Sequence, residues 1–89
     1  MQTQPVTPSD IAGGKVRIPI EAKVMFPKEP TMLELVFRGR SLSCKWNPQV
    51  GPDKERSGVL QIGKAVLEEM VKPGKVLKVT ATETGLRID

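Results

Sequence analysis

The feature that most restricts the fold of this sequence is an internal repeat with constant spacing. When the chain is shifted by 44 residues against itself, apolar positions of residues 14–46 fall on apolar positions of residues 58–89 without a gap. The matched pairs are Val16 and Leu60, Ile18 and Ile62, Ala22 and Val66, Phe26 and Met70, Met32 and Val76, Leu33 and Leu77, Leu35 and Val79, Phe37 and Ala81, Leu42 and Leu86, and Cys44 and Ile88. A single offset kept through several elements indicates a duplication. We therefore predict two similar halves that superpose.

The first half predicts a strand, then a short helix or turn, and then a hairpin. Apolar and other residues alternate through residues 16–20, 33–37 and 42–46, which is the period of a half-buried strand. The last two segments flank Gly39, so they form a hairpin. A turn at Gly39–Arg40 pairs Phe37 with Leu42, and a turn at Arg38–Gly39 keeps the same apolar face. Either turn places the apolar side chains of both strands together.

The second half repeats this order. Residues 58–63 read as a short strand, and residues 64–71 carry apolar side chains on one helical face. Pro73 and Gly74 end that helix, because proline disfavours helical geometry in the residue before it. Residues 75–81 are rich in β-branched side chains and read as a strand, and residues 86–88 return alongside it.

The fold class that follows is mainly β: a small barrel or pseudo-barrel built from two similar strand-helix-hairpin halves, with one or two short helices. A chain of 89 residues is sufficient for one domain, which we place at residues 14–89, with a loop at residues 47–57 between the halves 14–46 and 58–89. Residues 1–13 are polar and carry one charge, which predicts a disordered N-terminal tail. The expected core side chains are Leu33, Leu35, Ile62, Leu77 and Val79.

Composition argues against an enzyme. The chain has no histidine and a single cysteine, so it lacks the residues for histidine-based acid–base catalysis, Cys/His zinc sites and an intrachain disulfide. We expect no catalytic residues, no metal and no cofactor. Neither a signal peptide nor an apolar run long enough to cross a membrane is present, so we expect a cytoplasmic protein with no membrane partner.

Basic residues are concentrated in the first half. The formal net charge is +4, and residues 14–46 contain seven basic and three acidic residues, against five and four in residues 58–89. Lys15 and Arg17 alternate with the buried face of the first strand, and Arg38 and Arg40 flank Gly39. These cations favour contacts with phosphates. The alternative is that edge strands and hairpin tips carry cations only to resist aggregation.

Two further side chains each have two interpretations. Trp46 ends an apolar strand face, which is typical of core packing, and the alternative is stacking on a nucleic acid base. Cys44 alternates in phase with Leu42, which is typical of a buried small hydrophobe, and the alternative is a reactive thiol.

The segment Gly14–Lys23 resembles the opening of the AbrB and MazE type swapped-hairpin domains, whose pattern is roughly Gly-Arg-Val-x-Ile-Pro-x-Glu-Leu-Arg. This resemblance implies that two such units interlock their hairpins into one barrel that binds DNA as a transcription regulator or antitoxin. The basic positions of the pattern fall on Lys15 and Lys23, and Arg17 is a neighbouring addition of this sequence. In the second copy Gly63 stands in place of the expected proline, and Gln61 stands where Arg17 does, so the halves are expected to differ in function.

We therefore expect a small basic DNA-binding module, a transcription regulator or an antitoxin-like protein. Its DNA-binding residues are predicted to be Lys15, Arg17, Lys23, Arg38 and Arg40. The alternative function is a protein-interaction or accessory domain that binds no nucleic acid and uses a hydrophobic edge around Met25, Phe26 and Trp46. The sequence leaves the oligomeric state open.

Overall fold

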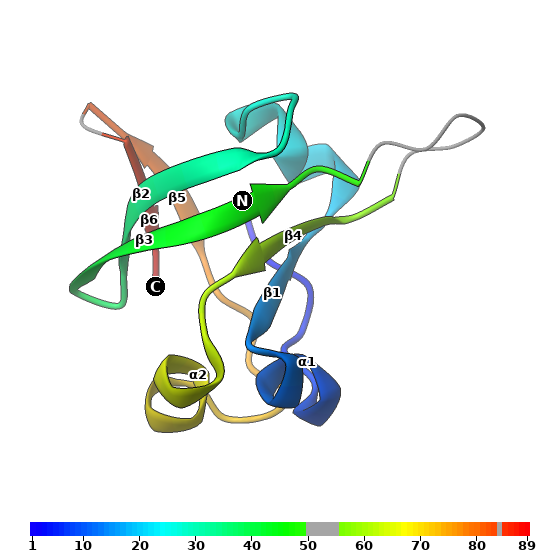
Figure 1. Cartoon of the computed structure of the whole chain (residues 1–89), viewed down its shortest axis with the longest axis vertical. Coiled ribbons are helices and arrows are strands. Elements are labelled where there is room, and N and C mark those ends of the chain that lie inside the picture. Colours follow the sequence, from blue (N-terminus) through cyan, green and yellow to red (C-terminus); the bar gives the residue numbers. More distant parts are fainter. Residues whose placement is uncertain (50–55, 84) are drawn as a thin grey trace.

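A six-stranded sheet curls into a half-barrel around the core of this protein, and three short helices accompany it (Figure 1). The computed structural model describes residues 1–49, 56–83 and 85–89. The strand order is β1-β4-β3-β2-β6-β5, and among these described strands β2 and β6 pair in parallel whereas every other neighbouring pair is antiparallel. In chain order the elements are α1 (Pro8–Gly13), β1 (Lys15–Ile18), the 3-10 helix η1 (Ile20–Met25), β2 (Thr31–Phe37), β3 (Arg40–Asn47), β4 (Gly58–Gln61), α2 (Lys64–Met70), β5 (Val79–Thr82) and β6 (Gly85–Ile88).

The two halves have the same order of elements, as the repeat predicts. The first half is β1-η1-β2-β3 and the second is β4-α2-β5-β6. The halves meet through equivalent strands, because Val16 of β1 lies opposite Leu60 of β4 in an antiparallel pair. Equivalent core positions also agree, since Ile18, Ile62, Leu35 and Val79 are all buried. Phe37 is buried whereas its equivalent Ala81 is exposed, because β5 is an edge strand of the sheet.

The β2–β3 hairpin turns at Arg38–Gly39. Phe37 pairs with Arg40 and Leu35 pairs with Leu42, so the turn predicted at Gly39–Arg40 is wrong and the alternative turn is the one adopted. Arg38 and Gly39 have φ angles of 49° and 87°, the positive values that a type I′ turn requires. The apolar face is preserved, because the two registers differ by an even number of residues.

Trp46 is the largest side chain in the core. It is fully buried, its ring stacks on Phe26 with 4.5 Å between centroids, and its Nε1 donates a hydrogen bond of 2.8 Å to the Pro27 carbonyl. A methyl group on Gly58 would overlap the Trp46 ring, so only glycine fits there. Trp46 is therefore a core residue and is not available to stack on a base. Of the other expected core residues, Leu35, Ile62, Leu77 and Val79 are buried and Leu33 is half-buried.

Residues 1–13 differ from the disordered tail expected from their composition. The backbone of residues 1–6 lies between β1 and residues 75–79, where Gln4 donates to the Arg17 carbonyl (3.0 Å) and Thr3 donates to the Leu77 carbonyl (2.8 Å). Val6 is fully buried, and Thr7 forms a capping box at the start of α1. The composition argument fails here because β1 and residues 74–79 supply backbone partners, which the sequence of this segment alone cannot show.

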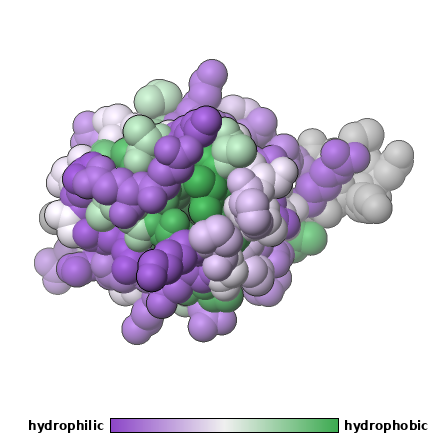
Figure 2. Space-filling model, turned by 90° about the horizontal axis from the view of Figure 1, so that it is seen from below, coloured by the Kyte–Doolittle hydropathy of each residue, from purple (hydrophilic) through white to green (hydrophobic). Residues whose placement is uncertain are grey.

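Helices α1 and α2 pack together at one end of the half-barrel (Figure 1). Their residues Ile11, Val66 and Met70 are half-buried against the core. Figure 2 views the molecule from this end and shows apolar side chains at the centre of the face, surrounded by polar ones. This end of the molecule therefore carries apolar surface at its centre.

Candidate nucleic-acid interface

Lys15 and Arg17 lie on the solvent face of β1, as their alternation with buried residues predicts. Lys15 lies opposite Gln61 of β4, and Gln61 in turn lies opposite Lys45 of β3. Two lysines therefore flank Gln61 in one row across three strands.

Arg17 is bound within the protein. Its Nε donates to both carboxylate oxygens of Asp10, at 3.0 and 3.1 Å, and its Nη2 donates to the Pro5 carbonyl at 3.0 Å. The Asp10 side chain is 4% exposed. Burial acts to raise the pKa of Asp10, but hydrogen bonds from the Thr7 backbone and from Arg17 outweigh it and hold that pKa below its ordinary value of 3.8. Arg17 thus fixes the N-terminal segment to β1.

Lys23 is also used inside the fold. Its side chain is buried, and its Nζ donates a hydrogen bond of 2.8 Å to the Arg56 carbonyl. This contact ties η1 to the residues that precede β4. Most of the remaining loop lies outside the described residues, so the structure does not describe residues 50–55 of the predicted 47–57 loop.

Arg38 lines a shallow depression together with two cations that the sequence analysis did not select. The depression lies between the β2–β3 turn, the segment before β5 and the end of β6, and it is lined by Arg38, Gly39, Lys75, Arg87 and Asp89. Arg87 donates to the Asp89 carboxylate at 2.7 Å. Arg38 and Lys75 are exposed, and neither forms an ion pair with any residue that the structure describes. We call Arg38, Lys75 and Arg87 the turn-end cations.

Arg40 points to another element. Its Nη2 lies 3.5 Å from Glu69 Oε1 on α2, and both side chains are about half exposed. Solvent screens such a pair strongly, so Arg40 remains accessible to an external anion.

The five predicted residues do not form one surface. Strand β4 separates β1 from β3, and Lys15 aligns with Lys45 rather than with the start of β3, where Arg40 lies. Arg17 and Lys23 are held by internal contacts, and Arg38 lies with Lys75 and Arg87 instead. For Arg87 a sequence signal was present: it alternates with the apolar residues Leu86 and Ile88, which predicts a side chain on the solvent face of the strand. No sequence signal places Lys75 near Arg38.

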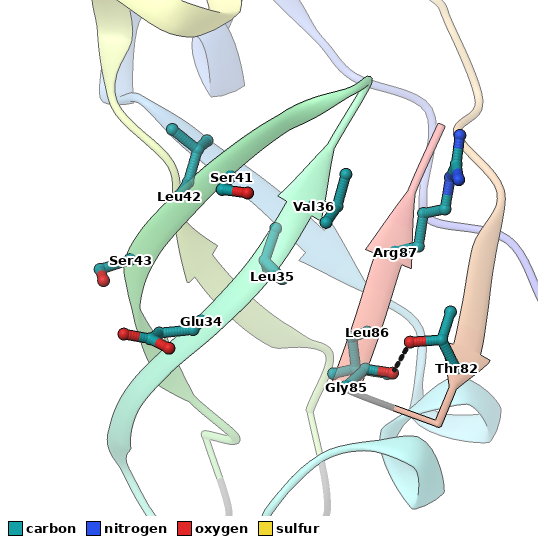
Figure 3. Close-up of a pocket in the computed structure, with 10 residues that line it drawn as sticks. All are labelled: Glu34, Leu35, Val36, Ser41, Leu42, Ser43, Thr82, Gly85, Leu86 and Arg87. Atoms are coloured by element: carbon teal, nitrogen blue, oxygen red, sulfur yellow. Dashed lines mark hydrogen bonds between the residues drawn. The ribbon is translucent and has the colours of Figure 1, made fainter.

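A polar groove lies on the solvent face of the sheet beside the turn-end cations (Figure 3). Glu34, Val36, Ser41, Ser43 and Arg87 alternate with buried or half-buried residues of β2, β3 and β6, so their side chains face away from the core. Glu34 lies opposite Ser43, and Val36 lies between Ser41 and Arg87. The groove has a volume of about 460 Å³, and Thr82 and Gly85 close its far side.

An apolar surface surrounds η1. Val24 is 80% exposed and Ile20 is 45% exposed, and both line an open groove with Phe26, Pro27 and Pro48. The hydrophobic edge expected around Met25, Phe26 and Trp46 is wrong in its composition, because Phe26 and Trp46 are buried. Exposed apolar surface nonetheless lies next to them.

Cys44 is a buried free thiol, and desolvation raises its pKa to about 11. It therefore stays protonated and inert at neutral pH, which confirms the interpretation of a small core hydrophobe. Within residues 1–49, 56–83 and 85–89, no group of His, Cys, Asp or Glu side chains could hold a metal ion. None of the helices formed by those residues has the length and apolar character needed to cross a bilayer.

Comparison of the chain with protein-family models found no match, and comparison with curated proteins also found none.

Proposed function

We propose that this chain is a DNA-binding module that holds DNA phosphates with the turn-end cations, in the manner of a small transcription regulator or antitoxin. The observation that carries this proposal is the convergence of Arg38, Lys75 and Arg87, from three separate segments, on one open depression that Asp89 also lines. Arginine presents fixed pairs of donors that match phosphate oxygens, and lysine adds a point charge. Lys15 on β1 and Lys45 on β3, which flank Gln61 of β4 on the solvent face of the sheet, offer a second, separate pair of cations.

A salt titration of duplex DNA binding tests this proposal. Each phosphate contact releases counterions, so affinity should fall steeply with salt, and the double variant Arg38→Ala/Lys75→Ala should reduce the slope of log K against log salt by about two. The charge-matched control Lys28→Ala/Lys64→Ala should leave the slope nearly unchanged. Equal losses in the two variants would show that net charge alone drives binding. No duplex binding by the parent at about 50 mM salt would reject the proposal.

The second candidate is a protein-interaction domain without nucleic acid binding. Exposure of Val24 and Ile20 beside Phe26 and Pro27 favours it, because contiguous apolar surface on a small protein commonly marks a contact site. A chain that binds no duplex and whose Val24→Asp variant loses association with a protein partner would support this candidate over the first.

A further inference from the structure

The polar groove holds hydrogen-bonding groups that the protein itself does not use. Within the described residues, neither the Glu34 carboxylate nor the hydroxyls of Ser41 and Ser43 take part in a side-chain hydrogen bond or ion pair. All three side chains are exposed on one face of the β2–β3 hairpin. They therefore present one charged acceptor and two hydroxyl groups to whatever enters the groove.

Arg87 connects this groove with the depression that holds Arg38 and Lys75, because Arg87 lines both. Figure 3 shows Glu34 and Arg87 at opposite sides of the groove, with Leu35 and Val36 of β2 between them. The groove thus has Glu34 at one end and Arg87 at the other, and the Arg87 end continues into a depression lined by Arg38, Lys75 and Asp89.

The groove offers little for a flat aromatic ligand. The three aromatic side chains of the chain, Phe26, Phe37 and Trp46, are all buried in the core. A base or another ring therefore has no aromatic partner on which to stack. The free groups at Glu34, Ser41 and Ser43 instead suit a ligand with several hydroxyls at one end. Arg87, whose Nε donates to Asp89, can bind an anionic group at the other end with its Nη donors.

We infer that the polar groove is a binding site for a small sugar phosphate, with the sugar hydroxyls at Glu34 and Ser43 and the phosphate at Arg87, Arg38 and Lys75. Its volume of about 460 Å³ falls within the range of small-molecule sites, about 300 to 1,000 Å³. The site shares Arg38, Lys75 and Arg87 with the proposed DNA contact, but it does not rest on DNA binding, because the chain is expected to bind this ligand in the absence of DNA.

The test is a titration of the isotope-labelled chain, followed by NMR, with ribose 5-phosphate, ribose and inorganic phosphate in separate arms. Ribose 5-phosphate should bind at least about tenfold more tightly than either fragment, and the largest shifts should fall on the backbone amides of Ser43, Gly85 and Arg87. Equal binding of inorganic phosphate and ribose 5-phosphate would reduce the site to a general anion patch and overturn the inference, as would no binding of ribose 5-phosphate.

Two variants locate the sugar end. Glu34→Ala should weaken ribose 5-phosphate binding about tenfold, because a hydrogen-bond acceptor for the sugar is removed, and it should not weaken inorganic phosphate binding, because Glu34 contacts only the sugar. The matched control Glu29→Ala removes an exposed carboxylate that does not line the groove and should affect neither ligand. If both variants bind ribose 5-phosphate as the parent does, the groove does not hold the sugar. Loss of DNA binding in a separate assay would leave this result intact.

Discussion

Arg17 on β1 and Arg38 at the β2–β3 turn are the same residue type in the same half of the repeat, yet they have opposite roles. Arg17 donates three hydrogen bonds, to Asp10 and Pro5, and fixes the N-terminal segment. Arg38 is exposed and forms no ion pair within the described part of the chain. The difference arises from the neighbours of each side chain: Asp10 and Pro5 of the N-terminal segment accept from Arg17, and among the described residues no such segment contributes an acceptor to Arg38. A cation on a solvent face is therefore available to a ligand only where the rest of the chain leaves it uncovered.

The largest expected effect comes from Asp10, the buried partner of Arg17. Asp10→Ala removes the capping box of α1 and leaves Arg17 without its carboxylate, so the free energy of unfolding should fall by about 3 kcal/mol. Urea denaturation measures this. Asp89→Ala, which removes an exposed carboxylate from Arg87, should change it by less than about 0.5 kcal/mol. Equal midpoints for Asp10→Ala and the parent would show that Arg17 does not anchor the fold.

The next largest effect on the free energy of unfolding is expected from replacing Arg17, with Arg38 as the comparison. Arg17→Met should lower the free energy of unfolding by about 1.5 kcal/mol, because the Asp10 carboxylate stays buried without its charged donor, and the one-third exposure of Arg17 limits the loss. Arg38→Met should change stability by less than about 0.5 kcal/mol. Comparable losses in the two variants would remove the distinction between them.

Acid should weaken the contact at Asp10. The folded-state pKa of Asp10 lies below its ordinary value of 3.8, so the folded protein binds fewer protons than the unfolded chain in that range. The stability that this group contributes is present above pH 3.8 and is lost as pH falls through the lowered pKa. The midpoint temperature of thermal unfolding should therefore fall more steeply below about pH 4 for the parent than for Asp10→Asn. Parallel pH profiles would contradict this.

A similarly small effect is expected at Arg40, which has an ion-pair partner as Arg17 does but is exposed as Arg38 is. Its pair with Glu69 spans 3.5 Å and is about half exposed, so Arg40→Ala should alter the free energy of unfolding by less than about 0.5 kcal/mol. A loss of 1.5 kcal/mol or more would place Arg40 with Arg17 as a structural cation.

The repeat and the alternation of apolar residues were sufficient to predict most of the fold. They gave the order of elements in both halves, the α2 helix near residues 64–70 and the solvent face of Lys15 and Arg17. They did not decide whether the β2–β3 turn lies at Arg38–Gly39 or at Gly39–Arg40, because both turns leave the apolar side chains on the same face of the hairpin. They did not predict that residues 1–13 adopt a defined structure. The composition of this segment carries no information on the backbone groups of β1 and residues 74–79 that it contacts.

The sequence by itself determined which side chains face the core and which face solvent, since that depends on periodicity over a few neighbouring residues. Only the tertiary structure decided which solvent-facing cations remain accessible. Asp10 pairs with Arg17, the Arg56 carbonyl accepts from Lys23, and Lys75 and Arg87 line one depression with Arg38. The second and third of these groupings bring together residues that are far apart in the chain. The curling of the sheet and the path of the N-terminal segment bring these groups together or keep them apart, because long-range contacts depend on the packing of the whole chain rather than on local pattern.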